Sequence, residues 1–353
     1  MPPHRLPVVE RLLSVVMKPW IRRVRLLIVC LFVFLPAFTS RGQNVGSLKL
    51  QRKIPLPGVI GRIDHFSADT AGKRLFVAAL GNGSVEVVDV ESAERISQIK
   101  GLKEPQGVFY DAEHRRLYVA TGGDGQVRIY DGKSFDLEST LDFGDDADNV
   151  RSDPKSGDIW VGFGSGGIGI IDSLGRKMGT ISLGSHPESF QFDETADRVY
   201  VNVPKQLGVT VIDREKRAVV AKWALGLSLA NYPMALDRAD QRLFVACRLP
   251  ARLVILNTNS GQIIQTVATV GDADEVFYDE KRRCVYVVGG EGAIEVIRQQ
   301  SPDVYQPAGR TVTAPGARTG YWWPSSDRLY VAAPAKGGQA AAVLVYAAVP
   351  NDR

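Results

Sequence analysis

Cysteine is scarce in this sequence, which contains only Cys30, Cys247 and Cys284 among its 353 residues. There is no Cys-x-x-Cys-His, so covalent haem of the usual kind is excluded. Cys247 and Cys284 fall near opposite ends of expected strands in neighbouring repeats, which is too far apart for a disulfide at about 3.3 Å per residue. We therefore predict two free, buried thiols and a fold stabilised by a large hydrophobic core rather than by disulfides.

Histidine is equally scarce, with four residues in the whole chain. Beyond the N-terminal segment only His65, His114 and His186 remain, and they do not have metal-ligand spacing, so the sequence does not indicate a His-rich zinc or copper site. We expect His186, which precedes Pro187 in a connection near the mouth of the fold's central channel, to be a surface-loop residue rather than a ligand, and we assign no role to His114. The sequence also has no Ser in a Gly-x-Ser-x-Gly elbow between a strand and a helix.

Long apolar runs are absent except for Leu26 to Phe38. This run has the length of a signal-peptide core and follows Arg22, Arg23 and Arg25, so we interpret residues 1–42 as a signal peptide cut ahead of Gln43. Because the preceding stretch is long, Met17 could be the true start. An uncut N-terminal anchor is the alternative. The signal predicts a periplasmic or secreted protein with no stable membrane anchor after cleavage.

The basic balance of the full chain belongs to this N-terminal segment. Residues 1–42 hold seven of the 43 Lys and Arg residues and one of the 39 Asp and Glu residues, which leaves 36 basic and 38 acidic residues and a net charge of −2. The remaining chain therefore gives no support for nucleic-acid or membrane-surface binding, and we predict no nucleic-acid partner.

One short apolar stretch recurs seven times along the rest of the chain. Its central aromatic residue is Phe76, Tyr118, Trp160, Tyr200, Phe244, Tyr286 and Tyr330, at intervals of 42, 42, 40, 44, 42 and 44 residues. This period is typical of a β-propeller whose blades are four-stranded sheets. We therefore predict that residues 43–353 form a single all-β domain, a seven-bladed β-propeller with four-stranded antiparallel blades.

A second recurring column supports this register. Seven residues before the aromatic marker stands an aspartate in six repeats, and Trp323 in the seventh; the aspartates are Asp69, Asp111, Asp153, Asp193, Asp237 and Asp279. An Asp side chain that accepts a hydrogen bond from the backbone two residues on starts a tight turn, so these residues predict the turn between the first and second strands. Gly-rich connections then lead to an alternating third strand and a weaker fourth strand.

The two ends of the chain complement each other. Residues 46–54 alternate apolar and polar side chains without a neighbour in their own repeat, whereas the last repeat is one strand short. We predict that the N-terminal strand becomes the outer strand of the seventh blade, which closes the ring.

The segments Arg198-Val199-Tyr200-Val201-Asn202 and 209–220 resemble the YVTN-repeat propellers, many of which are exported bacterial proteins. The resemblance extends over all seven repeats, although the final Asn is present only at Asn202. It implies the fold and carries no catalytic residues, because the family's motif is structural.

Two columns of residues are expected to surround the mouth of the central channel, five and four positions before each turn aspartate. The first consists of Asp64, Gln106, Asp148, Glu188, Tyr232, Asp274 and Arg318, and the second of His65, Gly107, Asn149, Ser189, Pro233, Glu275 and Thr319. Five carboxylates with His65, facing Arg318, make an acidic funnel. A solvated rim, a binding site for a hard cation such as Ca²⁺ or for a cationic ligand, and a catalytic site are the three interpretations.

We predict an exported binding or interaction module whose small-molecule or protein ligand docks at this channel face. No metal is singled out by the sequence. The alternative is a lactonase-like hydrolase, since some propellers of similar repeat type, of the phosphogluconolactonase kind, open lactones. A closed pocket in which Arg248 and Arg318 converge on His65 or Glu188 would favour the enzyme, and an open mouth lined by acids would favour binding.

Overall fold

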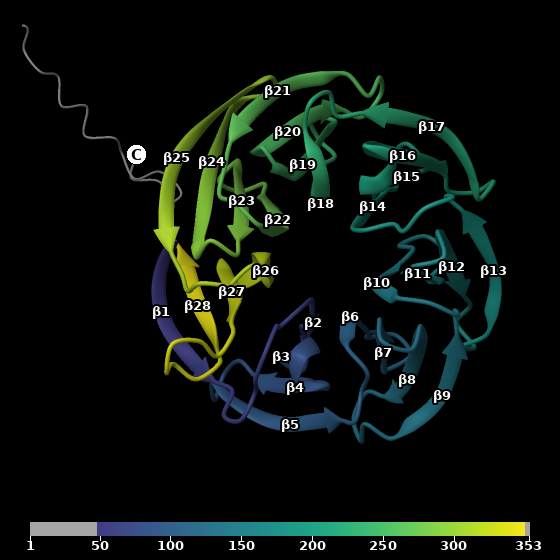
Figure 1. Cartoon of the computed structure of the whole chain (residues 1–353), viewed down its shortest axis with the longest axis vertical. Coiled ribbons are helices and arrows are strands. Elements are labelled where there is room, and N and C mark those ends of the chain that lie inside the picture. The colour runs from purple at the N-terminus through teal and green to yellow at the C-terminus, as the bar shows by residue number, and fades with distance from the viewer. Residues whose placement is uncertain (1–47, 350–353) are drawn as a thin grey trace, which may run out of the picture. The chain divides into compact units, whose positions relative to one another are not determined.

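The structure is a computed structural model that describes residues 48–349. Seven four-stranded antiparallel sheets are arranged in a ring around a central channel (Figure 1), so the fold prediction is confirmed. The expected signal peptide lies outside the described residues. Within residues 48–349, none of the helices has the length and apolar character needed to cross a membrane.

The first four blades follow one another along the chain, each running from an inner to an outer strand. Blade 1 contains β2 (Phe66–Asp69), β3 (Arg74–Ala79), β4 (Ser84–Asp89) and β5 (Glu94–Lys100), with the 3-10 helix η1 (Leu80–Asn82) between β3 and β4. Blade 2 contains β6 (Pro105–Asp111), β7 (Arg116–Thr121), β8 (Gln126–Asp131) and β9 (Leu137–Asp142). Blade 3 contains β10 (Ala147–Ser152), β11 (Ile159–Phe163), β12 (Gly167–Ile171) and β13 (Lys177–Ser182). Blade 4 contains β14 (Phe190–Asp193), β15 (Arg198–Val203), η2 (Pro204–Gln206), β16 (Gly208–Asp213) and β17 (Ala218–Ala224).

The last three blades complete the ring. Blade 5 contains β18 (Leu229–Asp237), β19 (Arg242–Leu249), β20 (Ala251–Asn257) and β21 (Ile263–Ala268). Blade 6 contains β22 (Ala273–Asp279), β23 (Cys284–Gly289), β24 (Ala293–Ser301) and β25 (Val304–Val312). Blade 7 contains β26 (Gly320–Trp323), η3 (Pro324–Ser326), β27 (Arg328–Ala333), β28 (Ala342–Ala348) and β1 (Leu48–Pro55).

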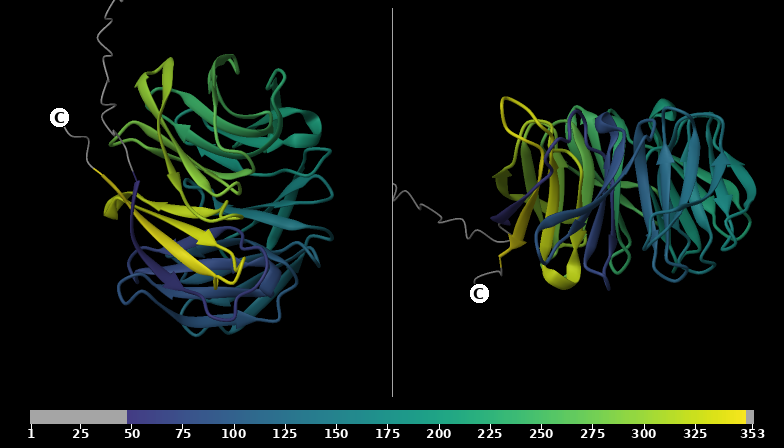
Figure 2. Two further views of the ribbon diagram at one scale, coloured as in Figure 1. Left: turned by 60° about the vertical axis from the view of Figure 1, so that its left-hand side comes forward. Right: turned by 90° about the horizontal axis from the view of Figure 1, so that it is seen from below.

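The predicted closure of the ring is confirmed. Strand β1 pairs antiparallel with β28 from Leu48 opposite Ala348 to Pro55 opposite Ala342, with a bulge after Leu50. Figure 1 and the side views of Figure 2 show this first strand beside the last one. Because Ile54 is fully buried among residues of blades 7 and 1, the closing strand contributes apolar burial as well as backbone hydrogen bonds.

The turn aspartates and the thiols also agree with the sequence predictions. Asp111 accepts the amide N–H of Glu113 at 3.0 Å, and Asp153 accepts that of Lys155 at 3.0 Å. Cys247 and Cys284 are free and buried, and burial raises the pKa of each thiol to about 12. A thiol held in this state has little nucleophilic thiolate, which is consistent with a structural role for both residues.

We predict that Ile54→Ala destabilises the protein by about 2–4 kcal/mol, because the substitution leaves a cavity at the ring closure. Leu50→Ala is the matched control, since Leu50 lies on the same strand with 43% of its surface exposed and should cost less than about 1 kcal/mol. Urea unfolding of both variants measures the difference. Equal losses of stability would contradict the closure as the source of the effect.

Candidate functional site

The channel mouth is assembled where the chain enters the inner strands. Asp64, Glu188 and Arg318 lie just before β2, β14 and β26, whereas Gln106, Asp148, Tyr232 and Asp274 lie within the first four positions of β6, β10, β18 and β22. Adjacent inner strands approach closely here: a Cβ at position 107 would lie 1.9 Å from the carbonyl oxygen of Asp148. Gly107 therefore permits blades 2 and 3 to bring their mouth residues together.

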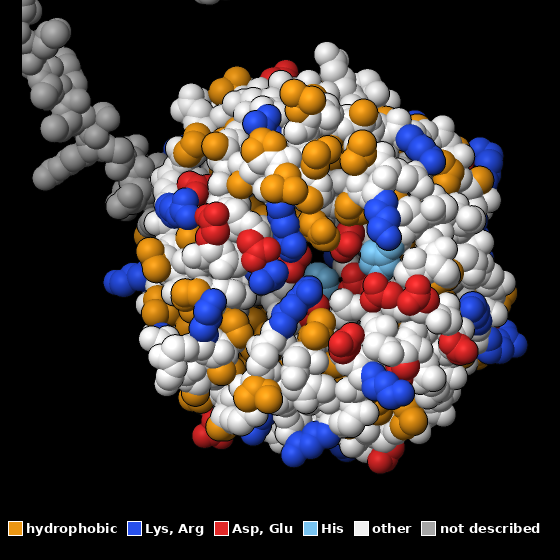
Figure 3. Space-filling view, in the orientation of Figure 1, with side chains coloured by type: hydrophobic (Ala, Val, Ile, Leu, Met, Phe, Trp, Pro, Cys, Tyr) orange, Lys and Arg blue, Asp and Glu red, His pale blue; other side chains and the backbone are white. Residues whose placement is uncertain are grey.

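The mouth contains a cleft of about 450 Å³, a volume within the usual range for small-ligand pockets. Its lining is almost entirely polar and consists of Arg62, His65, Gln106, Asp145, Asp146, Asp148, Gly164, His186, Glu188, Lys205, Tyr232, Arg248 and Asp274. Figure 3 shows acidic, basic and histidine side chains gathered around the hollow at the centre of this face. The expected acidic funnel is therefore a site of mixed charge.

His65 lies among carboxylates at the centre of the mouth. Its Nδ1 is 2.8 Å from Glu275 Oε1, and its Nε2 is 3.8 Å from carboxylate oxygens of both Asp64 and Asp148 and 3.4 Å from the side-chain amide of Asn149. Burial would lower the pKa of His65, but Asp64 and the hydrogen bond to Glu275 outweigh it and raise the pKa to about 10. His65 is therefore a cation at neutral pH that offsets the charge of its neighbours.

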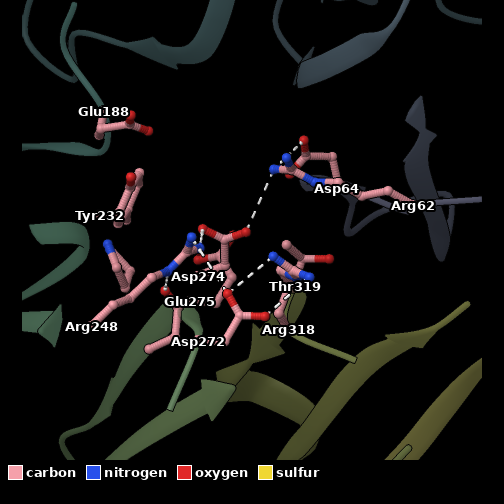
Figure 4. A network of polar contacts seen from close by, with 12 residues as sticks. Arg62, Asp64, Glu188, Tyr232, Arg248, Asp272, Asp274, Glu275, Arg318 and Thr319 are labelled. Carbon is pink, nitrogen blue, oxygen red and sulfur yellow. Dashed lines mark hydrogen bonds and ion pairs between the residues drawn. The ribbon is translucent and has the colours of Figure 1, made fainter. Parts of the chain in front are cut away.

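Arginines neutralise the carboxylates on the side of the mouth formed by blades 1, 5 and 6 (Figure 4). Arg62 lies 2.9 Å from Asp64 and 3.5 Å from Asp274, and Arg248 lies 2.5 Å from the other oxygen of Asp274. The guanidinium of Arg248 also stacks over the ring of Tyr232 at 4.0 Å. Burial raises the pKa of Asp274 to about 6 although Arg248 opposes the shift, so Asp274 remains ionised and paired at neutral pH.

Arg318 and Asn149 are positioned away from the main cleft. Arg318 forms a bidentate pair with Asp272 at 3.0 and 3.1 Å and is not part of the cleft lining. Asn149 accepts a hydrogen bond from Arg151 at 3.3 Å and, with His65, Arg151 and Glu275, lines a smaller cavity of about 30 Å³. Gln106 donates to Asp146 at 2.7 Å at the edge of the cleft. The convergence of Arg248 and Arg318 on one pocket, which would have favoured an enzyme, is therefore only half present.

Among the described residues, the carboxyl groups that blades 3 and 4 contribute, Asp148 and Glu188, form no ion pair with an arginine. Burial and the nearby charges of Asp148 and Asp274 raise the pKa of Glu188 to about 9. Burial also raises the pKa of Asp148 above its ordinary value, although His65 and His186 oppose the shift. His186 lies in the connection between β13 and β14 near the mouth, as expected, but its side chain is half-buried in the cleft wall rather than on the open surface, and its Nε2 is 3.9 Å from both carboxyl groups.

Several residues of the mouth were not found by counting along the repeats. They are Arg62, Asp145, Asp146, Arg151, His186, Lys205 and Asp272. Most lie in the connections between blades or beyond the two counted columns, where the repeat register no longer applies. The spacing His186-x-Glu188, with Glu188 in the first column, was the one available signal for a His beside a carboxylate.

The pairing of the mouth carboxylates determines which of them are available to bind a metal ion. Asp274 is engaged by two arginines, so a calcium site that used it together with Asp148 would have to break these ion pairs. Asp148, His186 and Glu188 instead bring one ligand atom each within 4.8 Å of one another. An imidazole and two carboxylates without guanidinium partners are the groups in the described mouth that fit a divalent cation most directly.

Comparison with known proteins identifies the fold class. No family model and no curated protein matches the sequence. Among solved structures, a chain of hydrazine synthase from Kuenenia stuttgartiensis is similar with a TM-score of 0.72 and 14% sequence identity, over 84% of this chain and 99% of that chain. This protein is thus a seven-bladed β-propeller. At that identity the likeness shows the fold alone, and the resemblance to YVTN-repeat propellers stays a prediction.

We predict that the protein loses stability as the pH rises from 7 to 9 in chelating buffer. His65 and Glu188 have folded-state pKa values of about 10 and about 9, above their ordinary values of 6.5 and 4.5, so the unfolded chain binds fewer protons in this range and its free energy falls relative to the folded state. With allowance for partial exposure, the loss should be about 1–3 kcal/mol in urea unfolding.

Glu188→Gln should make this decline shallower, because it removes a group that retains its proton in the folded state but not in the unfolded chain, while His65 and the buried thiols of Cys247 and Cys284 keep their contributions to the slope. Asp145→Asn, in the same cleft, should leave the slope unchanged. A stability that increases between pH 7 and 9 would show that the two groups do not titrate as their surroundings indicate.

Proposed function

We propose that the protein is an exported β-propeller that binds a small, hydroxyl-rich ligand in the cleft at its channel mouth. The observation that carries this proposal is the cleft of about 450 Å³, whose wall offers cationic donors and carboxylate acceptors side by side. Export rests on the apolar run from Leu26 to Phe38 and its basic flank, and predicts a periplasmic or secreted protein.

The lining favours a ligand that both donates and accepts hydrogen bonds. Arg62, Lys205 and Arg248 can donate, and Asp145 and Asp146 can accept. Hydroxyl groups do both, whereas a purely anionic ligand would meet the carboxylates and a purely cationic one the arginines. A sugar or a sugar acid therefore suits the cleft better than an apolar molecule or a nucleic-acid strand.

The ion pairs of the mouth also hold the binding groups in place before a ligand arrives. Asp274 is held between Arg62 and Arg248, and Arg248 is held further by the ring of Tyr232 and by the carbonyl of Ala273 at 2.9 Å. Side chains fixed in this way lose less conformational entropy on binding. This preorganisation supports a recognition role over a freely solvated rim.

We expect a panel of monosaccharides and sugar acids to contain ligands that raise the melting temperature in a saturable manner. The double variant Lys205→Met, Asp145→Asn removes one exposed donor and one exposed acceptor from the cleft and should weaken binding at least about tenfold. Isothermal titration measures the affinities.

The matched control is Lys73→Met, Glu91→Gln, which makes the same kind of charge change at an ion pair outside the mouth. The control should bind as the unaltered chain does. Absence of stabilisation by every member of the panel, or equal binding by both double variants, would contradict the proposal.

The second candidate function, lactone hydrolysis, is favoured by Glu188. Its pKa of about 9 keeps this cleft carboxyl protonated at neutral pH, so it could act as a general acid. Water would add to the lactone carbonyl carbon, the acyl C–O bond of the ring would break, the ring oxygen would take the proton of Glu188, and the proton lost by the attacking water would return to the Glu188 carboxylate. Arg248 would stabilise the negative charge on the carbonyl oxygen.

Sugar lactones incubated with the purified protein test this candidate in a pH-stat. The protein should open them faster than buffer does, and Glu188→Gln should lower the rate about 100-fold or more while the Lys73, Glu91 control retains it. If the lactones open no faster with the protein than in buffer alone, the hydrolase proposal is contradicted and the binding proposal is unaffected.

A further inference from the structure

Asp148, His186 and Glu188 form a compact group of three potential ligands on the side of the cleft made by blades 3 and 4. Asp148 is the second residue of β10, the inner strand of blade 3, and His186 and Glu188 lie in the connection between β13 and β14. One ligand atom from each lies within 4.8 Å of the others, and His186 Nε2 is 3.9 Å from both carboxyl groups. These separations are too long for hydrogen bonds, so the three groups do not satisfy one another.

A second observation is the lack of partners for buried atoms of this group. The side chain of Asp148 is only 7% exposed, and its Oδ1 makes no hydrogen bond to any described residue. The buried Nδ1 of His186 makes none either. The unpaired atoms face His65 and Asp146, whereas the atoms turned toward one another are Asp148 Oδ2, His186 Nε2 and Glu188 Oε1. Within residues 48–349 no Lys or Arg pairs with Asp148, so only the two imidazoles at 3.8 and 3.9 Å offset its buried charge, and a cation between the three groups would complete the pairing.

We infer that Asp148, His186 and Glu188 bind a divalent transition-metal ion such as Zn²⁺ or Mn²⁺. Metal–ligand bonds of about 2.0–2.2 Å place neighbouring ligand atoms roughly 3.0–3.6 Å apart, so the observed 3.9 Å separations need only small side-chain movements. An imidazole ligand favours these ions over Ca²⁺ and Mg²⁺, which prefer oxygen ligands throughout.

Neighbouring residues are placed to orient the ligands. The carboxylate of Asp146 lies 3.7 Å from His186 Nδ1, the ring nitrogen opposite the one that faces the metal position. The amide of Asn149 donates to Asp148 at 3.3 Å. A carboxylate behind a histidine ligand, and a donor to a carboxylate ligand, are the usual supporting contacts of protein metal sites.

Three protein ligands leave coordination positions open toward the cleft. The metal would offset the negative charges of Asp148 and of Glu188 in its ligating form, and could bind a hydroxyl or carboxylate oxygen of a ligand held by Arg248. In that respect the inference rests on the proposed function and extends it to ligands that chelate metals. Metal binding itself requires no sugar, so the two can be tested separately.

The test is a titration of the full chain, stripped with EDTA, with Zn²⁺ in competition with a chromophoric chelator, and with Co²⁺ by visible absorption. We expect one ion per chain, visible Co²⁺ bands that change in His186→Gln, and no competition from millimolar Ca²⁺ or Mg²⁺. Asp148→Asn, His186→Gln and Glu188→Gln should each weaken Zn²⁺ binding at least about 100-fold, and Asp146→Asn about tenfold.

Asp145→Asn is the matched control, since it removes a carboxylate from the same cleft but not from the ligand group. It should bind Zn²⁺ as the unaltered chain does. Equal weakening by Asp145→Asn and Asp148→Asn, a Co²⁺ spectrum unaffected by His186→Gln, or effective competition by Ca²⁺ would overturn the inference.

Folding of the variants is checked by their melting without metal. Asp148→Asn should melt no lower than the stripped chain, because it removes a buried carboxylate that no guanidinium neutralises, and Glu188→Gln should melt similarly, because the carboxyl that it replaces is protonated at neutral pH. Zn²⁺ binding without any sugar binding would support the metal site and contradict the proposed ligand. Sugar binding without Zn²⁺ binding would contradict the metal site and support the proposed ligand.

Discussion

The packing of one aromatic ring of each blade against the next blade is the interaction on which the ring depends. Phe76 stacks on Tyr110, Trp160 meets Phe192 edge to face, and Tyr286 packs against Trp322, with ring centroids 5.2–5.3 Å apart in each case. All seven marker residues are at most 2% exposed. Because large buried aromatic surfaces contribute strongly to stability and prefer defined geometries, this repeated contact sets the spacing of the blades and thereby the positions of the mouth residues.

The face opposite the mouth is held by fully paired carboxylates. Asp279 accepts hydrogen bonds from Arg282 and from the hydroxyl of Tyr286, both at 2.9 Å, and Arg282 also contacts Asp327 of the next blade at 2.8 Å. Asp153 is paired in the same way with Arg214 at 3.1 Å. On this face the repeated aspartates therefore serve the turn and the joint between blades, and their buried charge is compensated within the fold.

The fold could be predicted in detail from the sequence because the strand pattern recurs seven times. Each repeat gives separate evidence for the same positions of strands and turns. The same register found His65, Asp148, Glu188 and Asp274 at the mouth. It could not show how they pair, because Arg62 and His186 lie in connections where no period applies. The pairing of Asp274 with two arginines depends on side-chain direction across blades 1, 5 and 6, which distance along the chain does not encode. An acidic funnel was therefore expected where the structure has a mixed-charge cleft.

The contrast between the two faces is the strongest structural argument that the mouth has a function. Both faces are made from the same repeats, yet the turn aspartates are supplied with hydrogen-bond donors, whereas Asp148 at the mouth has a buried oxygen without a hydrogen bond to any described residue and no Arg or Lys partner among them. Burial of a carboxylate without a cationic partner of this kind costs stability, and nothing in the packing of the blades requires an acid at this position, since Gln106 and Tyr232 occupy the equivalent places in blades 2 and 5. Buried polar groups are normally paired within the fold. A buried carboxylate that is left unpaired, without a structural reason, is expected where a ligand or an ion supplies the missing partner. The inner ends of blades 3 and 4, which carry Asp148, His186 and Glu188, are therefore the part of this ring whose residues folding alone explains least, and they are the place where the proposed binding is best tested.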